Sequence, residues 1–176
     1  MSSCVAPRPP RIVFTTSKAW YSWFIRKFTR SPVSHVMLQF DVFGQELFLH
    51  ASVGGIQFTP RERFLADNRL VQEFEVLQPI ARERMHEMIT HLNDKYDYLG
   101  LLGFGLALAA QALTGRPRAN PLASSRAMVC SEFVARLDPE GAIVEGFRGL
   151  DPETTTPEAL RLICLAAAVK GQLAEL

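Results

Sequence analysis

One cysteine and two histidines are the residues of this 176-residue sequence whose types best suit nucleophilic catalysis. Cys130 follows a polar stretch rich in Gly, Pro, Asn and Ser, and it lies near the start of a helix predicted over residues 127–137. A thiol in the first turn of a helix senses the positive end of the helix dipole, which stabilises thiolate and lowers its pKa. We therefore treat Cys130 as a candidate nucleophile, with a small buried core cysteine as the alternative.

The histidines fall on a predicted hairpin. Residues 34–42 and 45–52 alternate between apolar and polar side chains, and Phe43-Gly44 supplies a turn between them. With a two-residue turn, position 42 faces 45 and position 37 faces 50. His35 and His50 then lie diagonally on one face, roughly 7–8 Å apart between Cα atoms.

Two imidazoles at that spacing match the logic of a catalytic triad. One could activate the thiol while the second orients the first. The alternative is a pair of half-exposed strand histidines. Asp41 and Glu46 share the face beside the turn and are further candidates for the orienting group.

The remaining elements must position these residues. Periodicity and turn signals predict strands at 11–16, 55–58 and 70–77, and helices at 17–28, 60–67, 79–92, 99–113, 127–137 and from 156 onwards. Thr59-Pro60-Arg61-Glu62 reads as a capping box for the second helix, with proline at its first position. Strands first and helices later indicate an α+β domain, with helices against one face of a mostly antiparallel sheet.

Several other classes of function are excluded by pattern. His86 and His91 are five residues apart, so they point about 140° away from each other on a helix and cannot share a metal. No Walker loop, dinucleotide fingerprint or Gly-x-Ser-x-Gly occurs. Nineteen basic and eighteen acidic side chains leave no basic excess for nucleic acid. We expect no metal and no other cofactor.

Length, cysteine usage and hydropathy predict the number of domains, the absence of a disulfide framework and the location of the chain. We expect a single domain over residues 1–176, with 1–10 as a flexible tail. Cys4 lies in that tail and Cys164 lies among aliphatics, so neither forms a disulfide framework. The start lacks the apolar core of a secretory signal, and the apolar run 99–113 is shorter than the roughly 20 residues of a span. A cytoplasmic chain without a membrane span is expected, while contact with a membrane surface stays open.

The order of these motifs resembles a known family. Ser34-His35-Val36, then Leu49-His50-Ala51-Ser52, and much later Val129-Cys130-Ser131-Glu132-Phe133-Val134 are similar to the circularly permuted papain-like cysteine hydrolases. These include the YiiX-like branch of the NlpC-type peptidases and the lecithin:retinol acyltransferase-like enzymes. Lys95-Tyr96-Asp97-Tyr98-Leu99-Gly100 and Thr156-Pro157-Glu158-Ala159-Leu160 extend the similarity, which covers about residues 11–162.

The resemblance implies a permuted papain-like fold with Cys130 as nucleophile, His35 as general base and His50 in the third polar position. That third position is histidine in the acyltransferase-like branch and more often an acid in YiiX-like members. The implied activity is a bacterial or bacteriophage cysteine peptidase or amidase, acting on a peptide such as that of the cell wall through an acyl-enzyme. The alternatives are a lipid acyltransferase or esterase, and an inactive binding module.

Overall fold

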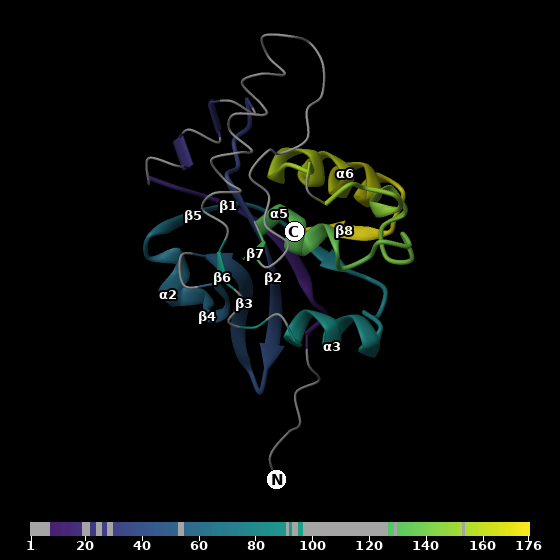
Figure 1. The fold of residues 1–176 in the computed structure, drawn as a ribbon, viewed down its shortest axis with the longest axis horizontal. Helices are drawn as coiled ribbons and strands as arrows, with labels where there is room; N and C mark the ends of the chain where they lie inside the picture. Colours follow the sequence, from purple (N-terminus) through teal and green to yellow (C-terminus); the bar gives the residue numbers. More distant parts are fainter. Residues whose placement is uncertain are drawn as a thin grey trace.

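A six-stranded antiparallel sheet organises the protein (Figure 1). The structure is a computed structural model that describes residues 8–18, 22–23, 26–27, 30–52, 55–90, 92, 95–96, 127–128, 130–152 and 154–176. The strand order is β4-β3-β2-β1-β5-β8, and each neighbouring pair is antiparallel. The strands are β1 (Arg11–Ser17), β2 (His35–Val42), β3 (Gln45–Ser52), β4 (Gly55–Pro60), β5 (Asn68–Val76) and β8 (Leu173–Glu175).

The described helices come mainly from the second half of the chain, as the sequence predicted. They are α2 (Arg61–Leu65), α3 (Arg82–Thr90), α5 (Cys130–Ala135), the 3-10 helix η1 (Glu145–Phe147) and α6 (Pro157–Val169). A short parallel pair joins β6 (Lys95–Tyr96) to β7 (Ala127–Met128). The α+β class with an antiparallel sheet is therefore confirmed.

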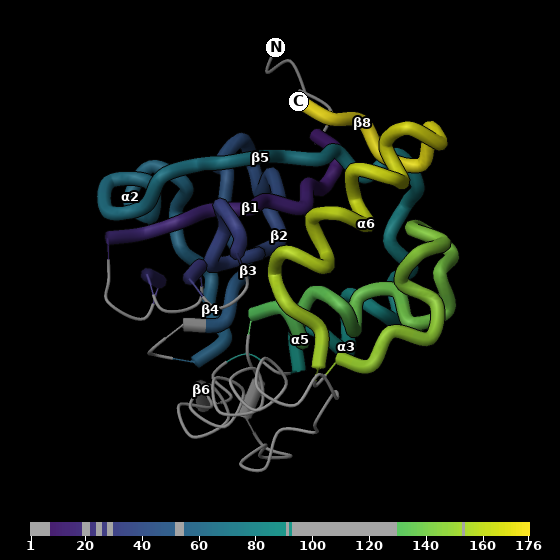
Figure 2. Tube along the Cα trace, turned by 90° about the horizontal axis from the view of Figure 1, so that it is seen from above, coloured from purple at the N-terminus to yellow at the C-terminus, as the bar shows by residue number. Residues whose placement is uncertain are grey.

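The two faces of the sheet bury different clusters. The major core is formed by sheet residues such as Phe14, Val36 and Leu38, and by Phe133 of α5 and Leu160 of α6. The minor core on the other face is formed by Val13, Met37 and Phe48, with Phe64 and Leu65 of α2 packed against them. Seen from above, α5 and α6 lie on one side of the strands and α2 lies on the other (Figure 2). The predicted polar face of the hairpin is thus covered by α2 near the histidines.

The hairpin that carries the histidines forms as predicted. Val42 pairs with Gln45, which leaves Phe43 and Gly44 as a two-residue turn. Both turn residues have positive φ, 54° for Phe43 and 82° for Gly44, as a hairpin turn of this length requires. Glycine adopts this conformation freely, whereas a phenylalanine there is strained.

Several predicted elements differ from the structure. Residues 127–128 form β7 and α5 begins at Cys130, because the first residues of the predicted helix pair with Lys95–Tyr96. The predicted capping box on α2 is wrong, since no side chain caps that helix. Helix α3 is shorter than the predicted 79–92; it buries Met88 and leaves Ile89 44% exposed.

One predicted helix is confirmed at its start, and two others lie largely or wholly outside the described residues. The last helix begins as expected, with Thr156 accepting a hydrogen bond from the Ala159 N–H. The helix predicted over 17–28 lies largely outside the described residues, and the helix predicted over 99–113 lies wholly outside them. Within the described part of the chain, none of the helices has the length and apolar character that crossing a membrane requires.

Candidate active site

The two histidines meet on the minor-core face of the sheet. Leu38 pairs with Leu49, so His35 at the start of β2 lies diagonal to His50 in β3. His35 Nε2 is 3.4 Å from His50 Nδ1, a long hydrogen bond, and the rings are perpendicular with centroids 5.5 Å apart. The predicted register and the diagonal relation therefore hold.

Phe64 of α2 covers both imidazoles. Its ring stacks on His35 at 5.9 Å between centroids and meets His50 edge-on at 4.9 Å. His50 is only 2% exposed and His35 is partly buried. Burial lowers the pKa of His50 to about 4, and burial together with the nearby charge of His50 lowers the pKa of His35 to about 3. Both imidazoles are therefore neutral at pH 7.

A threonine that the sequence did not suggest completes the polar contacts of this pair. Thr59 Oγ1 lies 3.0 Å from His50 Nε2. Thr59 pairs with Phe48 across β3 and β4, which sets it diagonal to His50 on the same face. The alternation of side chains along β4 indicates this neighbour, whereas the local pattern Thr59-Pro60-Arg61-Glu62 predicts a helix cap.

Cys130 is the first residue of α5 and is 5% exposed. The backbone N–H groups of Val36, Ser131 and Cys130 itself face the thiol and favour its thiolate. Burial outweighs them and raises the pKa of Cys130 to about 11. The expectation of a lowered pKa is therefore wrong, because the loss of solvent outweighs the backbone N–H groups that favour the thiolate.

The thiol and the imidazoles approach the start of β2 from different faces of the sheet. Helix α5 packs against β2 and β3, and Cys130 belongs to the major core together with Val36. Successive side chains of a strand point to opposite faces, so His35 points toward the minor core. The structure brings His35 and His50 into contact, and it brings the Cys130 thiol to the N–H of Val36, the residue that follows His35. Among the described residues it records no hydrogen bond between the Cys130 thiol and either imidazole.

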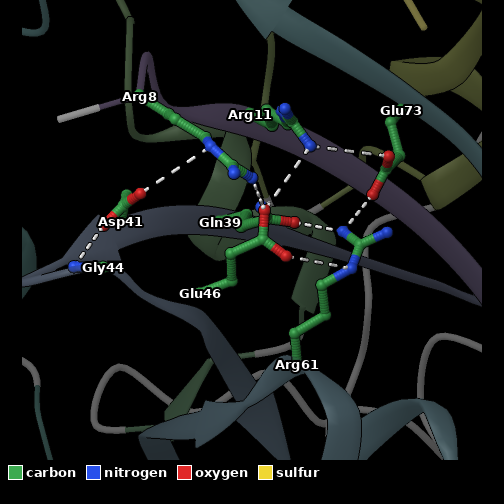
Figure 3. Close-up of polar contacts among 8 residues, drawn as sticks. All are labelled: Arg8, Arg11, Gln39, Asp41, Gly44, Glu46, Arg61 and Glu73. Carbon is green, nitrogen blue, oxygen red and sulfur yellow. Dashed lines mark hydrogen bonds and ion pairs between the residues drawn. The ribbon is translucent and has the colours of Figure 1, made fainter. Parts of the chain in front are cut away.

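Arg61, the first residue of α2, makes polar contacts with side chains of the neighbouring strands (Figure 3). Its guanidinium binds Gln39 and Glu73 and lies 3.5 Å from Glu46. It also lies over the ring of Phe48, 5.5 Å from the centroid. These contacts tie the first residue of α2 to three strands of the sheet.

The two carboxylates considered as orienting groups have other partners. Glu46 pairs with Arg8 at 2.7 Å, while Asp41 accepts a hydrogen bond of 2.8 Å from the Gly44 N–H (Figure 3). Both lie at the turn end of the hairpin. His50 is thus the group in contact with His35.

The described residues contain no group of three or more His, Cys, Asp or Glu side chains that could hold a metal ion. His86 belongs to this part of the chain, and His91 lies outside it. Cys164 is fully buried in α6, as the sequence predicted, and burial raises the pKa of its thiol.

Comparison with known proteins gives a fold relationship. No protein family's sequence profile matches the chain, and no curated protein matches it. The structure is similar to that of the metalloprotein YiiX from Escherichia coli O157:H7, with a TM-score of 0.59 and 16% identity over 97% of this chain and 96% of that one. At this identity the likeness shows the fold alone, and this chain shares the mixed α+β fold of YiiX.

Proposed function

We propose that this protein is a cysteine hydrolase of the circularly permuted papain-like class, formed as one domain over residues 1–176. Cys130 is the nucleophile, His35 the general base and His50 the group that orients His35. The observation that carries the proposal is the contact between His35 and His50 at the start of β2, where the Cys130 thiol meets the Val36 N–H. The YiiX-like fold is consistent with a hydrolase.

The raised pKa of the thiol and the lowered pKa of the imidazole define the resting state. With values of about 11 and about 3, both groups are neutral at pH 7. A preformed thiolate–imidazolium pair is therefore not the reactive species. In the proposed reaction the thiol proton passes to His35 as sulfur attacks the carbonyl, so His35 acts as a general base in the same step. This transfer requires the Cys130 thiol, which rests on the α5 side of the sheet, to come within reach of the imidazole.

The backbone around the thiol suits an acyl-transfer reaction. The C–S bond forms as the carbonyl becomes an oxyanion, and the N–H groups of Cys130 and Val36, which face the thiol, are the candidate donors to it. His35 then protonates the leaving amine or alcohol, which leaves an acyl-Cys130 thioester. Water attacks the thioester, gives its proton to His35, and the acid departs as the thiol is restored.

Amide bonds, as in a cell-wall peptide, are the first substrate class. Lipid esters, with hydrolysis or acyl transfer, are the second, because His50 matches the acyltransferase-like pattern. Mass spectrometry of the group carried by Cys130 after incubation with each class separates the two.

The small ester 4-nitrophenyl acetate tests the chemistry without knowledge of the substrate. We expect one acetyl group per chain on Cys130, with release of 4-nitrophenolate. Cys130→Ser should abolish the thioester, and Cys164→Ala is the matched control because that thiol is buried in the major core. Acetylation of Cys164 alone, or none at all, would contradict the proposal.

A catalytically inactive binding module is the second candidate, and the burial of Cys130 favours it. A thiol that is 5% exposed and has a raised pKa also fits a core cysteine. This candidate predicts that ester, amide and lipid substrates all leave Cys130 unmodified, and that Cys130→Ala leaves every binding property intact.

A further inference from the structure

Thr59 has a side-chain contact that its sequence context does not explain. It precedes Pro60 and Arg61, where the sequence predicts a helix cap. The structure shows no side-chain cap on α2. The hydroxyl lies instead 3.0 Å from His50 Nε2. The hydroxyl group is thus directed to the histidine pair rather than to the adjacent helix.

The proton positions along this chain of contacts decide whether His35 can act as a base. A neutral imidazole carries one N–H and one acceptor nitrogen. If His50 Nε2–H donates to Thr59 Oγ1, then His50 Nδ1 accepts from His35 Nε2–H, and His35 Nδ1 is left as an acceptor. If Thr59 donates to His50 Nε2, every proton is reversed and His35 Nδ1 carries a hydrogen.

The rings themselves are held by packing rather than by polar contacts. Phe64 touches both imidazoles, and the pKa of each is so low that neither gains a second proton at pH 7. Because each ring is fixed in place and neutral, the only remaining variable is which of its two nitrogens carries the hydrogen. The hydrogen-bond partner of His50 Nε2 therefore determines the tautomer of both histidines.

We propose that Thr59 is a positioning residue that accepts the His50 Nε2–H and thereby fixes both histidines as Nε2–H tautomers. His35 Nδ1 then has a free lone pair for the Cys130 proton. This inference rests on the proposed function, in which His35 is the base. Thr59 itself touches neither the thiol nor the acyl group in this scheme.

Two variants separate the hydroxyl from the shape of the side chain. Thr59→Val keeps the branched volume without an acceptor, and Thr59→Ser keeps the hydroxyl. We expect acetylation of Cys130 by 4-nitrophenyl acetate to slow by about tenfold to a hundredfold in Thr59→Val, the usual effect of losing such a supporting group. Thr59→Ser should restore the rate to within about threefold of the unsubstituted protein, because its hydroxyl still accepts. Equal rates in all three proteins would overturn the inference.

Nitrogen-15 NMR of the imidazoles reads the tautomers directly and needs no substrate. We expect the Nε2–H form for His35 and His50 in the unsubstituted protein and in Thr59→Ser, and loss of the single form at His50 in Thr59→Val. Observation of the Nδ1–H form at His50 in the unsubstituted protein would refute the role of Thr59. Absence of Cys130 acetylation would refute the proposed function, while the tautomers would still decide the role of Thr59.

Discussion

Acidification from pH 7 to pH 5 should destabilise this protein through the buried histidine pair. The folded-state pKa is about 4 for His50 and about 3 for His35, against 6.5 in an unfolded chain. The unfolded state therefore binds more protons below pH 6.5, so the stabilisation is fully present above that pH. It is lost progressively as pH falls, until the folded-state pKa values are reached.

The magnitude follows from proton linkage. Between pH 7 and pH 5 each histidine of the unfolded chain goes from mostly neutral to mostly protonated, while the folded pair stays neutral. Integration gives a loss of about 2 kcal/mol per histidine, or about 4 kcal/mol in total. A domain is stable by about 5–15 kcal/mol, so the effect is a large part of the whole. Carboxylates with lowered pKa values, such as that of Glu158, titrate below this window.

Urea denaturation at pH 7, 6 and 5 measures the loss. With a slope of about 2 kcal/mol per molar urea, the midpoint should fall by about 2 M over the range. The His35→Gln, His50→Gln double variant should lose most of this pH dependence. His86→Gln is the matched control, because His86 is exposed on α3 and its loss leaves the buried pair intact. A double variant with the same pH dependence as the unsubstituted protein would refute the reasoning.

Four further outcomes follow from other parts of the structure. Phe43→Asn should raise Tm by about 2–4 °C in a thermal melt, because it relieves a positive φ at a fully exposed side chain; an unchanged or lower Tm would contradict the strain. Asp138→Ala should lower the free energy of unfolding by about 3 kcal/mol in urea denaturation, since the carboxylate accepts hydrogen bonds of 2.7 Å from the N–H groups of residues 142, 143 and 144. A loss below about 1 kcal/mol would contradict a stabilising role for these hydrogen bonds. Phe64→Ala should move the pKa of His50 up from about 4 toward 6.5 in an NMR titration, and no movement would mean that another group buries it. Iodoacetamide labelling of Cys130 should be slow at pH 7 and accelerate above pH 9, whereas fast labelling at pH 6 would show that its pKa is not raised.

The hairpin shows what local sequence can predict. Alternating side chains over residues 34–52 and the Phe43-Gly44 turn fixed the register, and the register placed His35 diagonal to His50. Side-chain period and turn length are local properties, so no knowledge of the rest of the chain was needed. The start of α6 was predicted for the same reason, from Thr156 and Pro157.

Cys130 and Thr59 show where local sequence fails. The pKa of Cys130 is set by burial against β2 and β3, which only the fold determines, and not by the dipole of its own helix. Thr59 matches a local capping pattern, but its hydroxyl contacts His50, which is distant in sequence, and does not cap α2. Strand β8, three residues long, is too short for a periodic signal.

In the proposed function, His35 takes the proton of Cys130 during attack on a carbonyl. The most direct measurement is the rate of Cys130 acetylation by 4-nitrophenyl acetate at pH 7 in the unsubstituted protein and in His35→Ala. General-base catalysis of this kind contributes about a hundredfold or more, so we predict a fall of at least that size. Equal acetylation rates in the two proteins would contradict the pairing of Cys130 with His35.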